Sequence, residues 1–228
     1  MPVIVFVSPK GGVGKTTSAL VLADQLARQT DVTVIDADPN KPVAMWAAGG
    51  AKPDRLHVVS DADEENIIDK IEEAAAKTPF VIVDLEGTAA KIVILAVSQA
   101  DLIVIPMQGS QLDASQASRA LKVVQQQEKM SRRKVPYGVL LTRTSPIIRT
   151  KTMKHLTGSF ESAGIDLFTS ELNEREAFKA MFSFAVPLDK LDPKEVSNLD
   201  KAIANAEEFA SEVIAKLREG MAQSQQVA

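Results

Sequence analysis

The stretch VIVFVSPKGGVGKTT, residues Val3–Thr17, decides the fold. Its first five residues, Val3–Val7, are apolar and mostly β-branched, which predicts a short buried strand. Ser8-Pro9 bounds this strand, and a glycine-rich turn follows. Beyond the turn, apolar residues recur over Thr16–Arg28 with the period of an amphipathic helix. A strand, a glycine-rich turn and a helix are therefore expected to follow one another directly.

The turn has the composition of a phosphate-binding loop. Gly11, Gly12 and Gly14 let the backbone turn so that successive N–H groups point at phosphate oxygens. The helix that follows adds the positive end of its dipole. In such a loop Lys15 would reach the β- and γ-phosphates, and the Thr16 hydroxyl would ligate Mg²⁺. The spacing approaches GxxxxGK[ST], but its first position is not glycine, and a second lysine is present at Lys10.

Composition indicates a single globular domain. The chain has 228 residues, of which 45% are hydrophobic and 25% charged. It has no cysteine, which excludes disulfides and thiolate metal sites and fits a cytoplasmic protein. Its net charge of −4 argues against a uniformly basic nucleic-acid-binding protein but leaves room for a local basic patch. No apolar run approaches the roughly 20 residues of a membrane span, and the N-terminus lacks the features of a signal peptide.

Apolar runs rich in Val and Ile alternate with amphipathic helices along the whole chain. Strands are predicted at 32–35, 56–59, 80–83, 102–105 and 137–141, and Pro106 is expected to end the fourth of these. Helices are predicted at 64–76, 114–129, 150–163 and 196–217. The alternation predicts an α/β fold, a mostly parallel twisted sheet with helices on both faces. Residues 1–228 would form one domain, with a flexible tail over about 219–228.

Polar residues gather where the predicted strands end, which is the edge where open α/β sheets bind ligands. They are Lys10–Thr17, Asp36–Asn40, Asp84–Gly87, Gln108–Asp113 and Arg143. Asp36 and Asp38 follow one strand, and Asp84 ends the strand Phe80–Val83. An apolar strand that delivers a carboxylate after a phosphate-binding loop is typical of a Mg²⁺ site. Asp36 and Asp38 also fit an ordinary Asp-rich turn, which is common.

These motifs, in this order, resemble the deviant Walker A group of P-loop ATPases, the ParA/MinD family. The resemblance covers Lys10–Thr17 (KGGVGKTT), Asp36–Asn40 (DADPN), Trp46, Val81–Asp84 (VIVD), and Pro106 followed by Ser110–Asp113 (SQLD). It implies the three-layer P-loop NTPase fold. The short chain is most similar to the small ParA partition ATPases that lack an N-terminal helix-turn-helix domain.

The resemblance implies ATP and Mg²⁺ as cofactors, a weak Mg-dependent ATPase activity and a role for each site residue. Lys10 would cross the interface of an ATP-bound homodimer to the partner's phosphates, and Asp38 would position the attacking water. Catalysis is expected from Lys10, Lys15 and Asp38. Nucleotide binding is expected from Lys10, Gly11, Gly12, Val13, Gly14, Lys15, Thr16, Thr17 and, as a base or ribose contact, Arg143. The metal would be held by Thr16, Asp36 and Asp84.

The sequence departs from the family after Asp84. Leu85-Glu86-Gly87 stands where many members have an aspartate, a small residue or proline, and a proline. Glu86 is either a second carboxylate near the γ-phosphate or a solvent-facing residue, and the second reading is favoured. The segment Asn173–Phe178 (NEREAF) is similar to a segment of alphaproteobacterial plasmid partition ATPases and VirC-type transfer ATPases. It equally fits an ordinary helix with Asn173 as its cap and Glu176 at N3.

The resemblance further implies a partition function. ATP-bound dimers would bind nonspecific DNA on the nucleoid, and a small centromere-binding adaptor would stimulate hydrolysis. Two basic clusters could contact phosphates, although such runs are commonly solvated helix ends. The first cluster is Lys129 with Arg132, Arg133 and Lys134. The preferred cluster is Arg143, Arg149, Lys151 and Lys154, where no aromatic residue intervenes to stack on bases.

Other functions stay open. The same ATPase could position a chemoreceptor cluster, a carboxysome or a conjugative relaxosome. A MinD-like membrane-associated regulator would need a basic amphipathic C-terminal helix, and the tail after Ala215 has too little apolar surface for one. The related iron proteins and arsenical pumps need cysteines and are rejected. Lys10 argues against a metabolic P-loop kinase.

Overall fold

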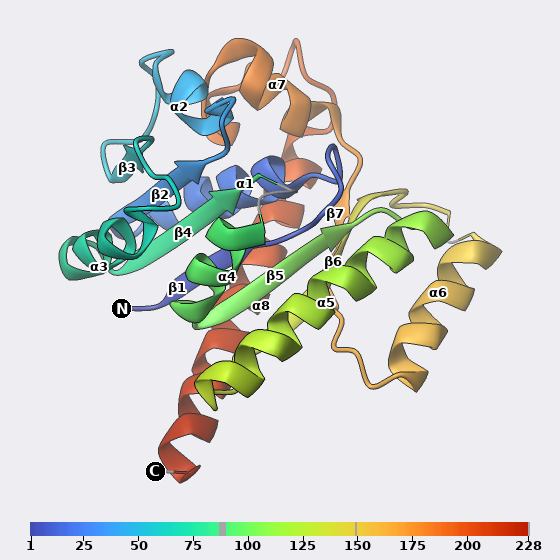
Figure 1. Ribbon diagram of the computed structural model, residues 1–228. Coiled ribbons are helices and arrows are strands. Elements are labelled where there is room, and N and C mark those ends of the chain that lie inside the picture. The colour runs from blue at the N-terminus through green and yellow to red at the C-terminus, as the bar shows by residue number, and fades with distance from the viewer. Residues whose placement is uncertain (87–89, 149, 228) are drawn as a thin grey trace.

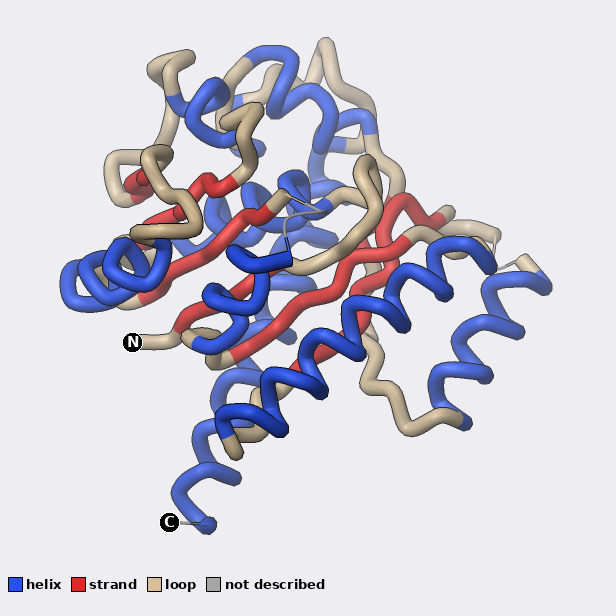
Figure 2. The backbone as a smooth tube through the Cα atoms, in the orientation of Figure 1, coloured by secondary structure: helices blue, strands red, loops and turns tan. Residues whose placement is uncertain are grey.

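A central parallel sheet organises the molecule. The computed structural model describes residues 1–86, 90–148 and 150–227, with the side chains of residues 90, 111–116 and 223–227 outside the description. In this part of the chain seven strands pair in the order β3-β2-β4-β1-β5-β6-β7, and every pairing is parallel (Figures 1 and 2). The strands are β1 (Val3–Phe6), β2 (Val32–Ala37), β3 (Leu56–Val59), β4 (Phe80–Leu85), β5 (Leu102–Met107), β6 (Tyr137–Thr144) and β7 (Leu172–Asn173). The predicted sheet is confirmed.

Helices cover both faces of this sheet, which gives three layers (Figure 1). One apolar cluster joins the sheet to α1 (Lys15–Ala27), α2 (Pro42–Ala47), α7 (Glu176–Phe184), the short 3₁₀ helix η1 (Leu188–Lys190) and α8 (Leu199–Val227). A second cluster joins the other face to α3 (Ile67–Lys77), α4 (Ala90–Ser98), α5 (Gln111–Ser131) and α6 (Lys151–Ser162). The three-layer α/β fold is therefore as predicted.

Strand periodicity explains the two clusters. In β1, Ile4 and Phe6 belong to the cluster with α1 and α8, whereas Val3 and Val5 belong to the cluster on the opposite face. Successive side chains of a strand point to opposite faces, so an apolar run with no polar alternation requires cover on both sides. All four residues are at most 4% exposed. Burial of this strand on both faces holds the glycine-rich turn at the centre of the sheet edge.

The prediction that Pro106 ends a strand is wrong, because β5 continues to Met107 and Pro106 pairs with Leu140 of β6. The carbonyl of Val104 accepts a hydrogen bond from the N–H of Val7 (3.0 Å), so alternate residues of β5 face β1. Pro106 lies two residues further on and faces the same side, beyond the last paired residues of β1 and β5. Its missing N–H therefore costs no ladder hydrogen bond.

The last helix also differs from the prediction, because α8 continues past Leu217 to Val227 through the residues expected to form a tail. Gly220 does not end it. A Cβ at Gly220 would lie 2.6 Å from Cγ of Pro136, so glycine here allows the helix to pass close to the chain before β6. The helical reading of Asn173–Phe178 is likewise corrected: Asn173 belongs to β7, and α7 begins after Arg175, with Glu176 as its first residue.

Candidate nucleotide-binding site

The glycine-rich turn lies at the carboxyl end of β1 and leads directly into α1. Gly12 and Gly14 have φ angles of 74° and 96°, in the left-handed region that favours glycine. Gly14 is the N-cap of α1, and no side chain among the described residues caps this helix end. The first N–H groups of α1 are therefore available to a ligand, and the helix dipole favours an anion there.

Two polar side chains from neighbouring strands fix the shape of this turn. Nε2 of Gln108, just after β5, donates to the carbonyl of Gly12 (3.0 Å). Oγ1 of Thr142, in β6, lies 2.6 Å from the carbonyl of Val13 and 3.1 Å from that of Met107. The carbonyls of Gly12 and Val13 point toward these two donors. The N–H groups of the turn therefore point to the other side, where a ligand can accept their hydrogen bonds. Sequence reasoning placed Gln108 at the ligand edge but did not single out Thr142.

Lys15, the first residue of α1, is held among carboxylates and is only 8% exposed. Burial lowers its pKa below the usual lysine value, and the negative charges of Asp84, Asp38 and Glu86 oppose that effect. Three carboxylates thus lie close enough to act on one ammonium group. Asp38 and Asp84 were each predicted as site residues, and both of their charges act on Lys15, as does that of Glu86; the roles predicted for these residues stay predictions.

Asp84 is completely buried at the end of β4. Burial raises the pKa of its carboxyl to about 7; the Thr16 hydroxyl and Lys15 lower it, whereas Asp36 and Asp38 raise it further. Within the described part of the chain, neither carboxylate oxygen has a hydrogen bond of good geometry. A buried carboxylate left in this state is costly unless a ligand or cation compensates it.

Asp36 is also fully buried and has a structural task that sequence reasoning did not foresee. Its Oδ2 accepts the backbone N–H groups of Val43 and Ala44, both at 2.9 Å, and so caps the start of α2. Burial raises the pKa of Asp36, and these two hydrogen bonds lower it. Its Oδ1 has no partner among the described residues.

Asp38 begins the turn that separates β2 from α2. Its Oδ1 accepts the backbone N–H (2.8 Å) and the side-chain amide (3.0 Å) of Asn40. Its carbonyl accepts the N–H of Lys41 (2.9 Å), whose φ of 48° reverses the chain. This is the Asp-rich turn that the sequence also allowed, and it leaves the Asp38 carboxylate close enough to raise the pKa of Lys15.

The acidic residues and Thr16 suit a hard divalent cation. Mg²⁺ prefers carboxylate and hydroxyl oxygens and commonly takes the rest of its shell from water and phosphate. Three carboxylate oxygens of Asp36 and Asp84 lack partners in the described residues. No group of three or more acidic or histidine side chains in that part of the chain could hold a metal alone. Thr16, Asp84 and Asp36 are therefore suited to a cation that arrives with a phosphate ligand.

A cavity of about 290 Å³ opens beside the turn. Its lining comes from the turn and α1, from the end of β6, and from the segment between β7 and α7. The lining includes Gly14, Thr17, Ser18, Thr142, Arg143, Asn173, Glu174, Arg175 and Phe178. Arg143, exposed and with a φ of 51°, lines this cavity, and the base or ribose contact expected of it stays a prediction. Arg175 and Phe178 were missed as site residues, although the NEREAF segment that contains them had been noted.

A hydrogen-bonded chain orients the α7 side of this cavity. Nη2 of Arg175 donates to Oδ1 of Asn173 (3.1 Å), and Nδ2 of Asn173 donates to Oγ1 of Thr144 (2.9 Å). Asn205 of α8 fixes the backbone by accepting the N–H of Asn173 (3.0 Å). Nε of Arg175 is buried and has no partner in the part of the chain described. The Arg175 guanidinium is thus both oriented and incompletely satisfied beside the cavity.

The other predicted residues lie at separate places. Lys10 is half-buried in the turn, with its backbone N–H 3.5 Å from Oγ of Ser8. Lys151 and Lys154 are exposed on α6. Arg149 lies outside the described residues, and so do the side chains of Gln111–Asp113. Arg133 of the other basic cluster pairs with Asp101 at 2.6 Å.

The fold and this turn define a P-loop ATPase of the ParA/MinD type. The chain belongs to the VirC1 protein family, whose model matches residues 1–215. Protein ParA of Rhizobium radiobacter is 38% identical over 222 residues, which are 97% of this chain and 100% of that protein. Protein virC1 of the same species is 27% identical over 187 residues (79% and 80%). Maintenance of carboxysome distribution protein A of Halothiobacillus neapolitanus is 24% identical over 172 residues (75% and 78%).

Solved structures agree on the fold. The Cyanothece McdA–ATP complex superposes with a TM-score of 0.74 at 18% identity and covers 93% of this chain and 96% of that one. At this level of identity the likeness concerns the fold alone. No helix in the described ranges is long and apolar enough to cross a membrane.

Proposed function

We propose that this chain is a Mg-dependent ATPase that segregates DNA by the ParA mechanism. The observation that carries the proposal is the gathering of Lys15, Asp38 and Asp84 at the start of α1, which no described side chain caps. A triphosphate there would receive the N–H groups of Gly11–Thr17 and the Lys15 ammonium. Its nucleoside would extend into the cavity beside Arg143 and Arg175.

The proposed roles follow from charge and position. Thr16 and Asp84 would hold Mg²⁺, with Asp36 beside its hydration shell, and the cation would neutralise charge on the transferring phosphate. Asp38 would orient the attacking water. Phosphoryl transfer needs positioning and charge neutralisation more than a strong base, so a slow ATPase with these residues can serve as a timer.

Lys10 would act in a second copy of the chain. Two nucleotides that face each other bring several negative charges together, and a cation supplied by the partner subunit offsets their repulsion. Dimerisation would then depend on bound triphosphate. Hydrolysis would remove the charge that Lys10 pairs with and release the dimer.

The proposed cargo is DNA, supported by the 38% identity to a protein named ParA along the whole chain. Lys151 and Lys154 of α6 are exposed and could contact DNA phosphates without reading bases. Arg149, which lies outside the described residues, belongs to the same proposed patch. Arg143 is assigned first to the nucleotide, since it lines the cavity. A small adaptor bound at a centromere would stimulate hydrolysis, and the ATP-bound dimer would reside on the nucleoid in the cytoplasm.

A second candidate keeps the ATPase and changes the cargo, as the likeness to a carboxysome distribution protein suggests. The residues of the nucleotide site are the same for both cargoes. The partner protein distinguishes them, because a small DNA-binding adaptor favours DNA as the cargo. A MinD-like membrane role has less support, because most of the large apolar residues of α8, up to Leu217, are buried in the core with α1. Pelleting with liposomes in the presence of ATP tests that role.

Calorimetric titration with Mg-ATP tests the proposal itself. Lys15→Gln should weaken ATP binding at least 100-fold, whereas Lys77→Gln, a matched change at an exposed lysine of α3, should leave it unchanged. Equal ATP affinity in the wild-type protein and Lys15→Gln would refute the proposed site. An unchanged hydrolysis rate in Lys15→Gln would do the same.

A further inference from the structure

Helix α2 is attached at its first turn to the acidic edge of the nucleotide site. The Asp36 carboxylate accepts the N–H groups of Val43 and Ala44 at 2.9 Å, and Nζ of Lys41 donates to the Asp36 carbonyl (3.1 Å). Charge-assisted bonds of this kind are stronger than neutral ones. A displacement of Asp36 therefore has to move α2 or break two of them.

The other end of α2 is attached to α7 through Trp46. The indole is 2% exposed, and its Nε1 donates to the carbonyl of Met181 (3.0 Å), with the carbonyl of Val186 at 3.4 Å. The chain after α2 also lies close to the residue that ends α7, because a Cβ at Gly49 would lie 2.3 Å from Cβ of Ala185. Figure 1 shows the two helices next to each other above the sheet edge.

One side of α7 and the residue before it line the cavity of the candidate site. Arg175, Phe178 and Phe182 contribute to the lining, together with Thr17 and Ser18 of α1. Phe178 and Met181 lie one turn apart on the buried side of α7. A ligand that presses on Phe178 thus acts on the same rigid helix that accepts the Trp46 hydrogen bond.

We propose that Trp46 is a positioning residue that couples occupancy of the cavity by a nucleoside to the placement of the Asp36–Asn40 turn. The coupling runs from the cavity through α7 to Trp46, and from α2 to Asp36. It rests on the proposed ATPase function. The coupling would place Asp36 and Asp38 correctly relative to the phosphates only when the nucleoside end of the ligand occupies the cavity.

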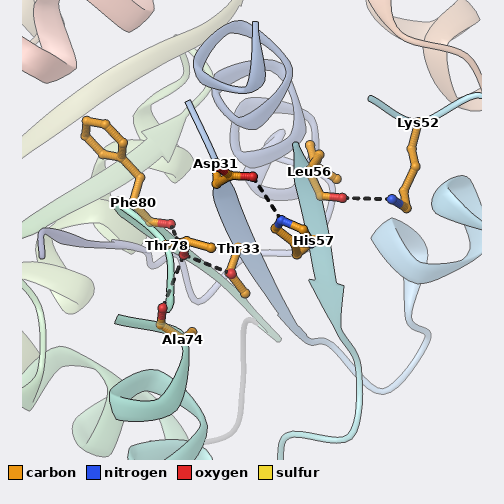
Figure 3. Close-up of polar contacts among 8 residues, drawn as sticks. All are labelled: Asp31, Thr33, Lys52, Leu56, His57, Ala74, Thr78 and Phe80. Atoms are coloured by element: carbon orange, nitrogen blue, oxygen red, sulfur yellow. Dashed lines mark hydrogen bonds and ion pairs between the residues drawn. The ribbon is translucent and has the colours of Figure 1, made fainter. Parts of the chain in front are cut away.

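The test compares two variants that each remove one buried hydrogen-bonding group. Trp46→Phe keeps an aromatic ring but removes the N–H donor to α7. Thr33→Val is the control: Thr33 lies in β2, the strand that carries Asp36, and its hydroxyl pairs with that of Thr78, the residue that follows α3 (3.0 Å, Figure 3). Both variants should lose similar thermal stability.

Trp46→Phe should lower kcat for ATP hydrolysis roughly tenfold, the size expected for one buried hydrogen bond, with KM changed by less than about threefold. Thr33→Val should keep both constants. If Trp46→Phe folds and its kcat equals that of Thr33→Val, the inference is wrong. If the wild-type protein binds no ATP by calorimetry, the proposed function fails and this inference fails with it.

Trp46 is the single tryptophan of the chain, so its emission provides a readout without any substitution. Saturating ADP or ATP should change the emission of the wild-type protein, because seating the nucleoside shifts α7 against the indole. The Phe178→Leu variant, which shortens the contact with the cavity, should reduce that change at equal occupancy. Should Trp46→Phe fail to fold, an emission spectrum unaffected by calorimetrically confirmed binding would overturn the inference.

Discussion

Asp36 and Asp84 are register partners on the adjacent parallel strands β2 and β4, and both are fully buried. Paired residues of neighbouring strands place their side chains on the same face, so the two carboxylates lie close together. Three of their four oxygens have no hydrogen-bond partner in the described chain. Two buried, like-charged groups in this state destabilise the empty protein and favour a cation.

Asp84→Asn should therefore stabilise the nucleotide-free protein and abolish its stabilisation by Mg-ATP. It removes a buried carboxylate whose pKa is raised to about 7 by burial, so the melting temperature of the nucleotide-free protein should rise by a few degrees at pH 8. The additional stabilisation by Mg-ATP should be lost. Differential scanning fluorimetry with and without Mg-ATP measures both effects, and a lower melting temperature of the nucleotide-free variant would contradict this account of the pair.

Asp38→Ala should stop hydrolysis without stopping ATP binding. The carboxylate is held by Asn40 in a turn and lies near Lys15, as expected for a residue that orients water. We expect an ATPase rate at least 100-fold lower and an ATP-bound dimer that accumulates on DNA. Light scattering after size exclusion measures the dimer; a monomer in saturating ATP would show that Asp38 does not have the proposed role.

Lys10→Ala should lower the ATPase rate by about tenfold or more, with less than threefold loss of ATP affinity in the monomer. The reason is that Lys10 is proposed to act on the partner's phosphates, so it contributes only after dimerisation. Dilution calorimetry below the dimerisation concentration gives the monomer affinity. Equal losses of rate and affinity would make Lys10 an ordinary ligand within its own subunit.

The pH dependence of the free energy of unfolding should reveal the buried carboxyl of Asp24, which lies on α1 away from the glycine-rich turn. Burial raises the pKa of Asp24 on α1 from 3.8 to about 6, and Arg28 partly offsets it. Between these pH values the folded state holds a proton that the unfolded state has released, so the free energy of unfolding falls as pH rises through this window. The displacement corresponds to about 3 kcal/mol.

Asp24→Asn should remove that part of the pH dependence, because the amide does not titrate. Urea unfolding at pH 4 and pH 7 should show the variant gaining stability relative to the wild-type protein at the higher pH. Parallel pH profiles for the two proteins would mean that Asp24 has an ordinary pKa in the folded state.

The sheet could be predicted because most of its strands are local apolar runs, and β1, β2 and β4 lead directly into the motif residues of the candidate site. The short elements could not. β7 has two residues, α2 has six and begins only after Lys41 reverses the chain, and the nine residues of α4 are mostly apolar, so their pattern does not separate strand from helix.

The part of the candidate site around the glycine-rich turn could be predicted from Lys10–Thr17, Asp38 and Asp84, because these residues form recognisable motifs in the sequence. The α7 side of the cavity could not be predicted, because Arg175 and Phe178 come to line the same cavity as Thr17 only through tertiary packing across more than 150 residues. Asp36 shows the same limit. Its position predicted a place near a cation, but its hydrogen bonds to Val43 and Ala44 depend on a helix that the sequence did not disclose.

Nucleotide-dependent DNA binding tests the central claim most directly. Fluorescence anisotropy with a labelled random-sequence duplex should show binding by the wild-type protein with ATP or a nonhydrolysable analogue, and little binding with ADP or without nucleotide. The double reversal Lys151→Glu with Lys154→Glu should abolish binding while the ATP-bound dimer persists. DNA affinity that is the same in the ATP, ADP and nucleotide-free states would contradict the account of an ATP-controlled partition switch.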